Sequence, residues 1–107
     1  MDSNETNDLQ DQLLELKQEL DCAYQDMDTA NREWLEAKEA QSEAFNDMRN
    51  RIIDHDGYLN YQKDTADKKD TFLQSKERFK ELKTLFEERK RIIFEKKTQS
   101  MREEGQL

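Results

Sequence analysis

The sequence predicts an all-α protein, a long antiparallel two-helix coiled-coil hairpin that we expect to dimerise into a four-helix bundle. Three observations lead to this fold class. Small and apolar residues alternate in steps of three and four through the first half, large apolar residues recur every seven in the second half, and proline is absent. Because proline breaks helices, its absence lets each helix run on without interruption. We expect residues 1–107 to form a single helical hairpin domain.

The first element is a helix expected over about residues 4–54. The line of small and apolar residues along this helix, its seam, follows the 3-4 spacing of a helix buried along one line. The seam consists of Leu9, Leu13, Leu16, Leu20, Ala23, Met27, Ala30, Trp34, Ala37, Gln41, Ala44 and Met48. Asp2 is the expected N-cap of this helix.

The second element is a turn expected at about residues 55–59. Asp54, His55 and Asp56 form its acidic tip, and Gly57 supplies the left-handed conformation that ends many helices. Asn60 is then expected to cap the next helix.

The third element is a second helix over about residues 60–103. Its seam carries large side chains, Phe72, Phe79, Phe86 and Ile93, each seven residues after the last. A bend centred near residue 58 sets large residues opposite small ones, which close packing of two helices requires. The expected pairs are Ala44 with Phe72, Ala37 with Phe79, Ala30 with Phe86, and Ala23 with Ile93. Far from the bend, apolar residues of the first helix no longer face apolar residues of the second. Leu9, Leu13, Leu16 and Leu20 are therefore expected to need cover from elsewhere.

Charge supports an antiparallel arrangement of the two halves. Residues 1–56 hold 16 acids and 5 bases, a net charge of −11, whereas residues 57–107 hold 10 acids and 13 bases, a net charge of +3. Opposite net charges favour the two halves lying side by side. A hairpin within one chain and an antiparallel pairing of two chains both satisfy this requirement.

The functional prediction follows from apolar side chains at or outside the edges of the seam. A two-helix hairpin is too thin to cover them, and exposed apolar stripes mark association surfaces. The expected partner-binding residues are Trp34, Leu35, Phe45, Leu73, Leu85 and Ile92. We therefore expect a non-enzymatic scaffold or adaptor that self-associates as a homodimer, binds another protein, or does both.

A second hypothesis is an acidic inhibitor or regulator. With a net charge of −8, the chain could occupy a basic groove as a nucleic-acid mimic or insert the acidic tip at Asp54 and Asp56 into a larger complex. The same charge argues against binding to nucleic acid itself, even though bases and phenylalanines are interleaved in residues 76–97.

Other function classes find little support in the sequence. His55 between two aspartates is the only histidine, and adjacent residues on a tight turn rarely converge on one metal ion. We expect no catalytic residues, no metal and no cofactor. The sequence contains no membrane-spanning stretch and a single cysteine, so a cytoplasmic location is expected, with Cys22 partly buried beside the seam.

Overall fold

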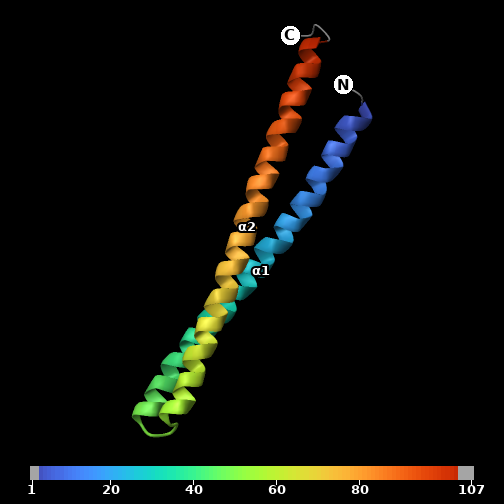
Figure 1. Cartoon of the computed structure of the whole chain (residues 1–107). Helices are drawn as coiled ribbons and strands as arrows, with labels where there is room; N and C mark the ends of the chain where they lie inside the picture. Colours follow the sequence, from blue (N-terminus) through green and yellow to red (C-terminus); the bar gives the residue numbers. More distant parts are fainter. Residues whose placement is uncertain (1–2, 104–107) are drawn as a thin grey trace. The chain divides into compact units, whose positions relative to one another are not determined.

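The computed structural model describes residues 3–103, which form two long α-helices and no β-strand in that range. Helix α1 runs over Ser3–Arg49 and helix α2 over His55–Glu103, joined by a loop at residues 50–54 (Figure 1). The predicted all-α class is therefore confirmed. The expected cap, Asp2, lies outside the described residues.

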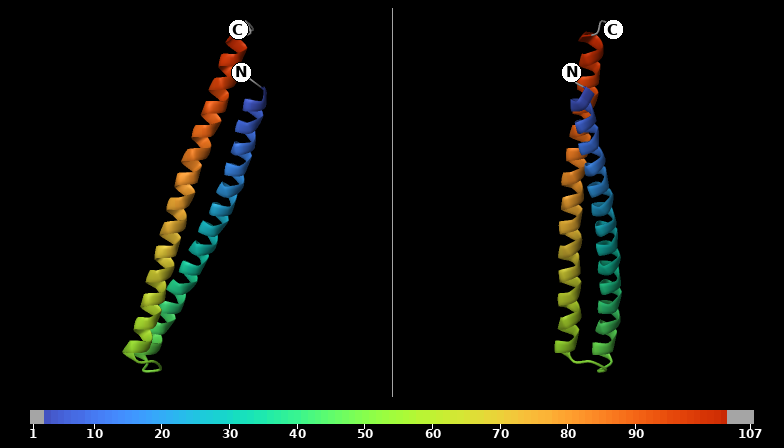
Figure 2. Two further views of the ribbon diagram at one scale, coloured as in Figure 1. Left: turned by 45° about the vertical axis from the view of Figure 1, so that its right-hand side comes forward. Right: turned by 90° about the vertical axis from the view of Figure 1, so that its right-hand side faces the viewer.

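The chain divides into two compact units, and each contains a segment of both helices. The first, called the loop unit here, is Tyr24–Arg78 and includes the loop. The second, called the terminal unit, combines Met1–Ala23 with Phe79–Leu107. In the loop unit, the end of α1 and the start of α2 lie side by side and run antiparallel, and the loop joins them (Figure 2). The loop unit is thus a helical hairpin formed within one chain.

Helix α1 ends in a Schellman motif without glycine. The N–H of Arg51 donates to the carbonyl oxygen of Met48 at 3.0 Å, and the N–H of Ile52 donates to that of Asp47 at 2.8 Å. Arg51 has a φ of 61°, the left-handed conformation that this motif requires at the residue after the C-cap, Asn50. A β-carbon makes this conformation unfavourable, so Gly is the usual residue there. The prediction that α1 continues to about residue 54 is wrong, because the helix ends at Arg49 and the left-handed residue that terminates it is Arg51 rather than Gly57.

Helix α2 begins earlier than the sequence indicated. The Oδ1 atom of Asp54 accepts a hydrogen bond from the N–H of Gly57 at 2.8 Å, which makes Asp54 the N-cap of α2. Gly57 therefore lies in the first turn of the helix rather than in the loop. The turn predicted at residues 55–59 actually occupies residues 50–54, and Asn60, the expected cap, lies inside α2.

The earlier turn changes which residues face each other in the loop unit. The Thr65 hydroxyl lies 3.2 Å from the carbonyl oxygen of Ala37, so Ala37 is level with Thr65 and not with Phe79, fourteen residues further on. Phe72 stacks on Trp34 with ring centroids 5.4 Å apart, so it lies far from its predicted partner Ala44. The predicted register is wrong by two heptads. A slip of whole heptads preserves the seam, so periodicity alone could not exclude it.

The terminal unit has a register consistent with the earlier turn. Leu16 of α1 and Arg89 of α2 line the same surface hollow, together with Gln12, Glu15 and Glu19. Ala23 therefore does not lie level with Ile93 as predicted, although both residues are buried. Leu9, Leu13, Leu16 and Leu20 are each partly buried along α1, and the expectation that further cover comes from outside the hairpin stays a prediction.

The α1 seam is confirmed by burial, because all of its members from Leu9 to Met48 are buried or partly buried. Among residues 7–99, however, the buried hydrophobic residues are only Ala23, Ala30, Ala37, Ala44 and Ile93. No side chain in that range is less than 2% exposed. Since each buried methylene or methyl group contributes only about 0.8 kcal/mol, four alanines make a thin core. Phe72, Phe79 and Phe86 are partly buried, and Cys22, expected to be partly buried, is exposed.

Candidate protein-docking edge

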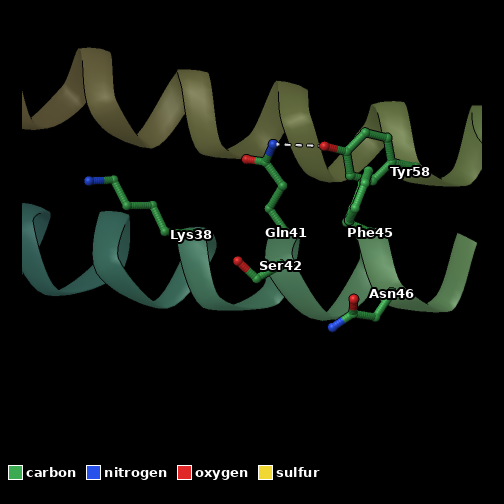
Figure 3. Close-up of a pocket in the computed structure, with 6 residues that line it drawn as sticks. All are labelled: Lys38, Gln41, Ser42, Phe45, Asn46 and Tyr58. Carbon is green, nitrogen blue, oxygen red and sulfur yellow. Dashed lines mark hydrogen bonds between the residues drawn. The ribbon is translucent and has the colours of Figure 1, made fainter. Parts of the chain in front are cut away.

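Two hollows open along one edge of the loop unit. The first lies near the loop and has a volume of about 540 Å³; it is lined by Lys38, Gln41, Ser42, Phe45 and Asn46 of α1 and Tyr58 of α2. Figure 3 shows Gln41 and Phe45 projecting from α1 toward Tyr58. The Gln41 side-chain amide donates to the Tyr58 hydroxyl at 3.3 Å, and the Phe45 ring meets the Tyr58 ring edge-on at 5.8 Å between centroids. These contacts make the floor of the hollow a preformed aromatic surface with one polar bridge.

The second hollow lies further from the loop on the same edge. It is lined by Tyr24, Met27, Asp28, Asn31, Phe72 and Lys76. The Phe72 ring that forms part of it is stacked on Trp34 with 24° between the ring planes. The Lys38 ammonium lies 3.7 Å from the centroid of the Trp34 ring, a cation–π contact. Trp34 is thereby fixed between an ammonium group and a second ring, so we assign it to the interior of the pair of helices.

Five of the seven large apolar side chains that are exposed in the loop unit lie on this edge. Leu35 lies within one helical turn of both Asn31 and Lys38, and Leu73 lies three residues before Lys76; residues so spaced share a helix face. Leu35 is 48% exposed and Leu73 is 46% exposed. We call the following five exposed residues the apolar edge. They are Tyr24, Leu35, Phe45, Leu59 and Leu73.

The other edge of the loop unit has the opposite character. A hollow there is lined by Glu33, Glu36, Ala37, Ala40, Asp64 and Lys68. Asp26 and Asp47 stand seven residues from Glu33 and Ala40 on the same side of α1. The Lys68 ammonium is 3.8 Å from a Glu33 carboxylate oxygen, which offsets part of the charge. We call these carboxylates the acidic edge; they are Asp26, Glu33, Glu36, Asp47 and Asp64. The loop unit therefore has one apolar edge and one acidic edge.

The structure separates the six predicted partner-binding residues into three groups. Leu35, Phe45 and Leu73 are exposed together on the apolar edge. Trp34 is partly buried between the helices, as described above. Leu85 and Ile92 belong to the terminal unit, where Leu85 is exposed and Ile92 is partly buried.

The predicted acidic tip has a different position from the one expected. His55 and Asp56 are exposed in the first turn of α2, and Asp54 uses one carboxylate oxygen to cap that helix. The loop itself starts with Asn50, Arg51 and Ile52.

Sequence reasoning missed Tyr24 and Leu59, and also the lysines beside them. The heptad repeat contained a usable signal: Tyr24 and Phe45 directly follow the seam alanines Ala23 and Ala44. Residues at that heptad position flank the interface of two helices. Lys69, Lys76, Lys83, Lys90 and Lys97 recur every seven residues at the corresponding position of the second helix.

The described residues contain neither a cluster of metal-ligating side chains nor a helix that could span a membrane. Within the described residues, no group of three or more His, Cys, Asp or Glu residues is arranged to hold a metal ion. Neither α1 nor α2, over residues 3–103, has an apolar stretch that could cross a lipid bilayer. Comparison of the chain with protein-family models, curated proteins and solved structures found no match.

Proposed function

We propose that this chain is a non-enzymatic interaction protein, a helical hairpin whose apolar edge binds a helical segment of a protein partner, as a scaffold or adaptor does. One observation carries the proposal. The buried hydrophobic residues among residues 7–99 are four alanines and one isoleucine, while large apolar side chains of both helices are exposed along one edge of the loop unit. Little apolar surface is therefore buried between the two helices, and the apolar edge provides further apolar surface that a partner can bury.

The geometry of the apolar edge suits a helix laid in the groove between α1 and α2. Tyr24 and Phe45, at the two ends of the edge, are 21 residues apart on α1, or about 31 Å at 1.5 Å per residue. A partner helix of about 20 residues covers that length, and an amphipathic helix binds such a groove through side chains three and four residues apart. The two hollows at Tyr58 and Phe72 provide places for such anchors.

Self-association through the same edge is the second form of this proposal. Because the apolar edge takes side chains from both α1 and α2, two hairpins packed edge to edge would form a four-helix bundle. Sedimentation equilibrium of the full chain distinguishes the two forms. Self-association gives a dimer that persists at high salt, whereas a chain reserved for another protein sediments as a monomer.

The acidic edge supports the alternative function, an acidic regulator that occupies a basic groove. Its carboxylates lie on the edge of the loop unit away from the apolar edge, and three of them, Glu33, Glu36 and Asp64, line a hollow there. Binding of this kind is electrostatic and falls steeply with salt, whereas binding through the apolar edge does not.

Affinity capture from the native host with matched variants tests the proposal. We expect Leu35→Ser/Leu73→Ser to lose partners that the unmodified chain retains, because both exposed anchors are removed from the edge. The matched control, Glu36→Ser/Glu43→Ser, changes two exposed residues of α1 away from that edge and should retain them. If the acidic-residue variant loses the partners and the leucine variant keeps them, the acidic regulator is the correct function.

A further inference from the structure

The apolar edge is flanked by lysines, and this charge indicates what kind of helix it accepts. Lys38 on α1 lines the first hollow and Lys76 on α2 lines the second. Lys69 stands four residues before Leu73, and Lys76 three residues after it, so both lie beside that leucine on the surface of α2. All three lysines are exposed.

These three ammonium groups lack carboxylate partners. Within the described residues, the ion pairs are Arg32 with Asp28, Lys68 with Glu33, and Arg91 with Glu95. Asp28 is the carboxylate that lines a hollow of this edge, and it is paired with Arg32 at 3.5 Å. Among the described residues, Lys38 and Lys76 therefore line the two hollows without a carboxylate partner, in a chain whose net charge is −8. Asp70 and Glu77 also lie within one turn of Leu73 but line neither hollow.

A second copy of the loop unit does not complement this surface. Packing one apolar edge against another places the lysines of both copies in the same interface, where like charges repel. The acidic edge of a copy supplies carboxylates, but its apolar lining consists of Ala37, which is buried, and Ala40. None of the residues that line the hollow of the acidic edge has a large apolar side chain that could enter the hollows near Tyr58 and Phe72.

We propose that the occupant of the apolar edge is an acidic amphipathic helix of another protein, with an apolar stripe against Leu35 and Leu73 and carboxylates on both flanks against Lys38, Lys69 and Lys76. This inference rests on the proposed function, since it specifies the partner for the same edge. The apolar stripe supplies affinity, and the flanking charges select acidic over basic helices. A few surface ion pairs correspond together to a selectivity of about tenfold.

A display selection with the full chain as bait tests the inference. The library consists of 21-residue helical peptides with a fixed leucine stripe, in which each flanking position is Glu, Gln or Lys. We expect the unmodified chain to enrich Glu over Lys at the flanks by about tenfold. The variant Lys69→Glu/Lys76→Glu should abolish or reverse this preference. The matched control, Arg78→Glu/Arg91→Glu, makes the same change in net charge at exposed positions of α2 outside the apolar edge and should keep it.

The possible failures are distinguishable. If no peptide is enriched, both the docking function and the acidic partner are overturned. Enrichment of leucine-stripe peptides without preference at the flanks, or with preference for Lys, overturns the acidic partner alone. If sedimentation shows a dimer that Leu35→Ser/Leu73→Ser dissociates, the occupant is a second copy and the inference is wrong. Circular dichroism of every variant verifies that helix content is retained.

Discussion

The Thr65 hydroxyl of α2 lies within hydrogen-bonding distance of the Ala37 carbonyl oxygen of α1, 3.2 Å away, and 2.9 Å from the carbonyl oxygen of Tyr61 in its own helix. This side chain thus links the backbones of the two helices at one level. Because Ala37 is 7% exposed and has only a methyl group, α2 can approach closely enough for the contact. The pair shows which residues of α1 and α2 face each other in the loop unit.

Replacing Thr65 with valine should destabilise the hairpin. Valine keeps the shape of threonine but cannot donate, so the hydroxyl proton shared between the Ala37 and Tyr61 carbonyl oxygens is lost, at a cost of about 1 kcal/mol in the free energy of unfolding. Chemical denaturation followed by circular dichroism measures the change. The control is Thr71→Val, which loses only a bond to Asp67 within α2 and should cost less than about 0.5 kcal/mol. Equal effects of the two substitutions would show that the interhelical bond is unimportant.

Asp54 is expected to be the most sensitive acidic residue near the loop. Asp54→Ala removes the oxygen that accepts from the Gly57 N–H, and loss of an N-cap costs about 1 kcal/mol. Asp54→Asn should retain nearly full stability, because the asparagine side-chain oxygen accepts the same bond. Asp56→Ala removes only a charge from the first turn of α2 and should cost about 0.5 kcal/mol. If Asp56→Ala were the more damaging change in thermal denaturation, the cap assignment would be incorrect.

Arg51→Gly should stabilise the protein, which is unusual for a substitution to glycine. The left-handed conformation of Arg51 is strained for a residue with a β-carbon, and glycine relieves about 1 kcal/mol of that strain. The net gain is smaller because glycine also gives the unfolded chain more freedom. Arg49→Gly, at the last residue of α1, should instead destabilise by about 1 kcal/mol. The comparison fails if both substitutions lower the urea midpoint.

Engineered cysteine pairs test the register in the loop unit directly. In a Cys22→Ser background, Ala37→Cys/Thr65→Cys should oxidise to an intramolecular disulfide, because the two backbones are close at this level. Ala44→Cys/Phe72→Cys should not, because it is displaced from the observed register by fourteen residues, or about 21 Å of helix. Mass spectrometry after mild oxidation counts the free thiols. Ready oxidation of the second pair would instead support the register expected from a bend near Gly57.

The α1 seam and the helical class could be predicted from the sequence because both depend on periodicity, which a long helix repeats many times. The position of the turn depends on a few local contacts. Gly57 resembled a helix terminator, but Asp54 binds its N–H and brings it into α2, while Arg51 adopts the conformation expected of a glycine. Because the turn lies earlier in the chain than predicted, the observed register of the two helices differs from the predicted one by two heptads.

The candidate edge was only partly predictable for a related reason. Leu35, Phe45 and Leu73 were recognised as lying outside the seam, but which of them share an edge depends on how the two helices face each other. That arrangement brings Tyr24 and Lys76 to one hollow, from positions 52 residues apart in the chain. Trp34 was expected to contact a partner, but it is held instead by Phe72 and Lys38.

Methyl NMR of the full chain, labelled at leucine and titrated with a Glu-flanked leucine-stripe peptide, tests the central claim most directly. We predict that the methyl signals of Leu35, Leu59 and Leu73 shift on binding. Leu14 and Leu85 are similarly exposed but belong to the terminal unit, so their signals should remain in place. Equal shifts at Leu14 and Leu85, or no shift at Leu35 and Leu73 with saturating peptide, would contradict the assignment of the apolar edge as the docking surface.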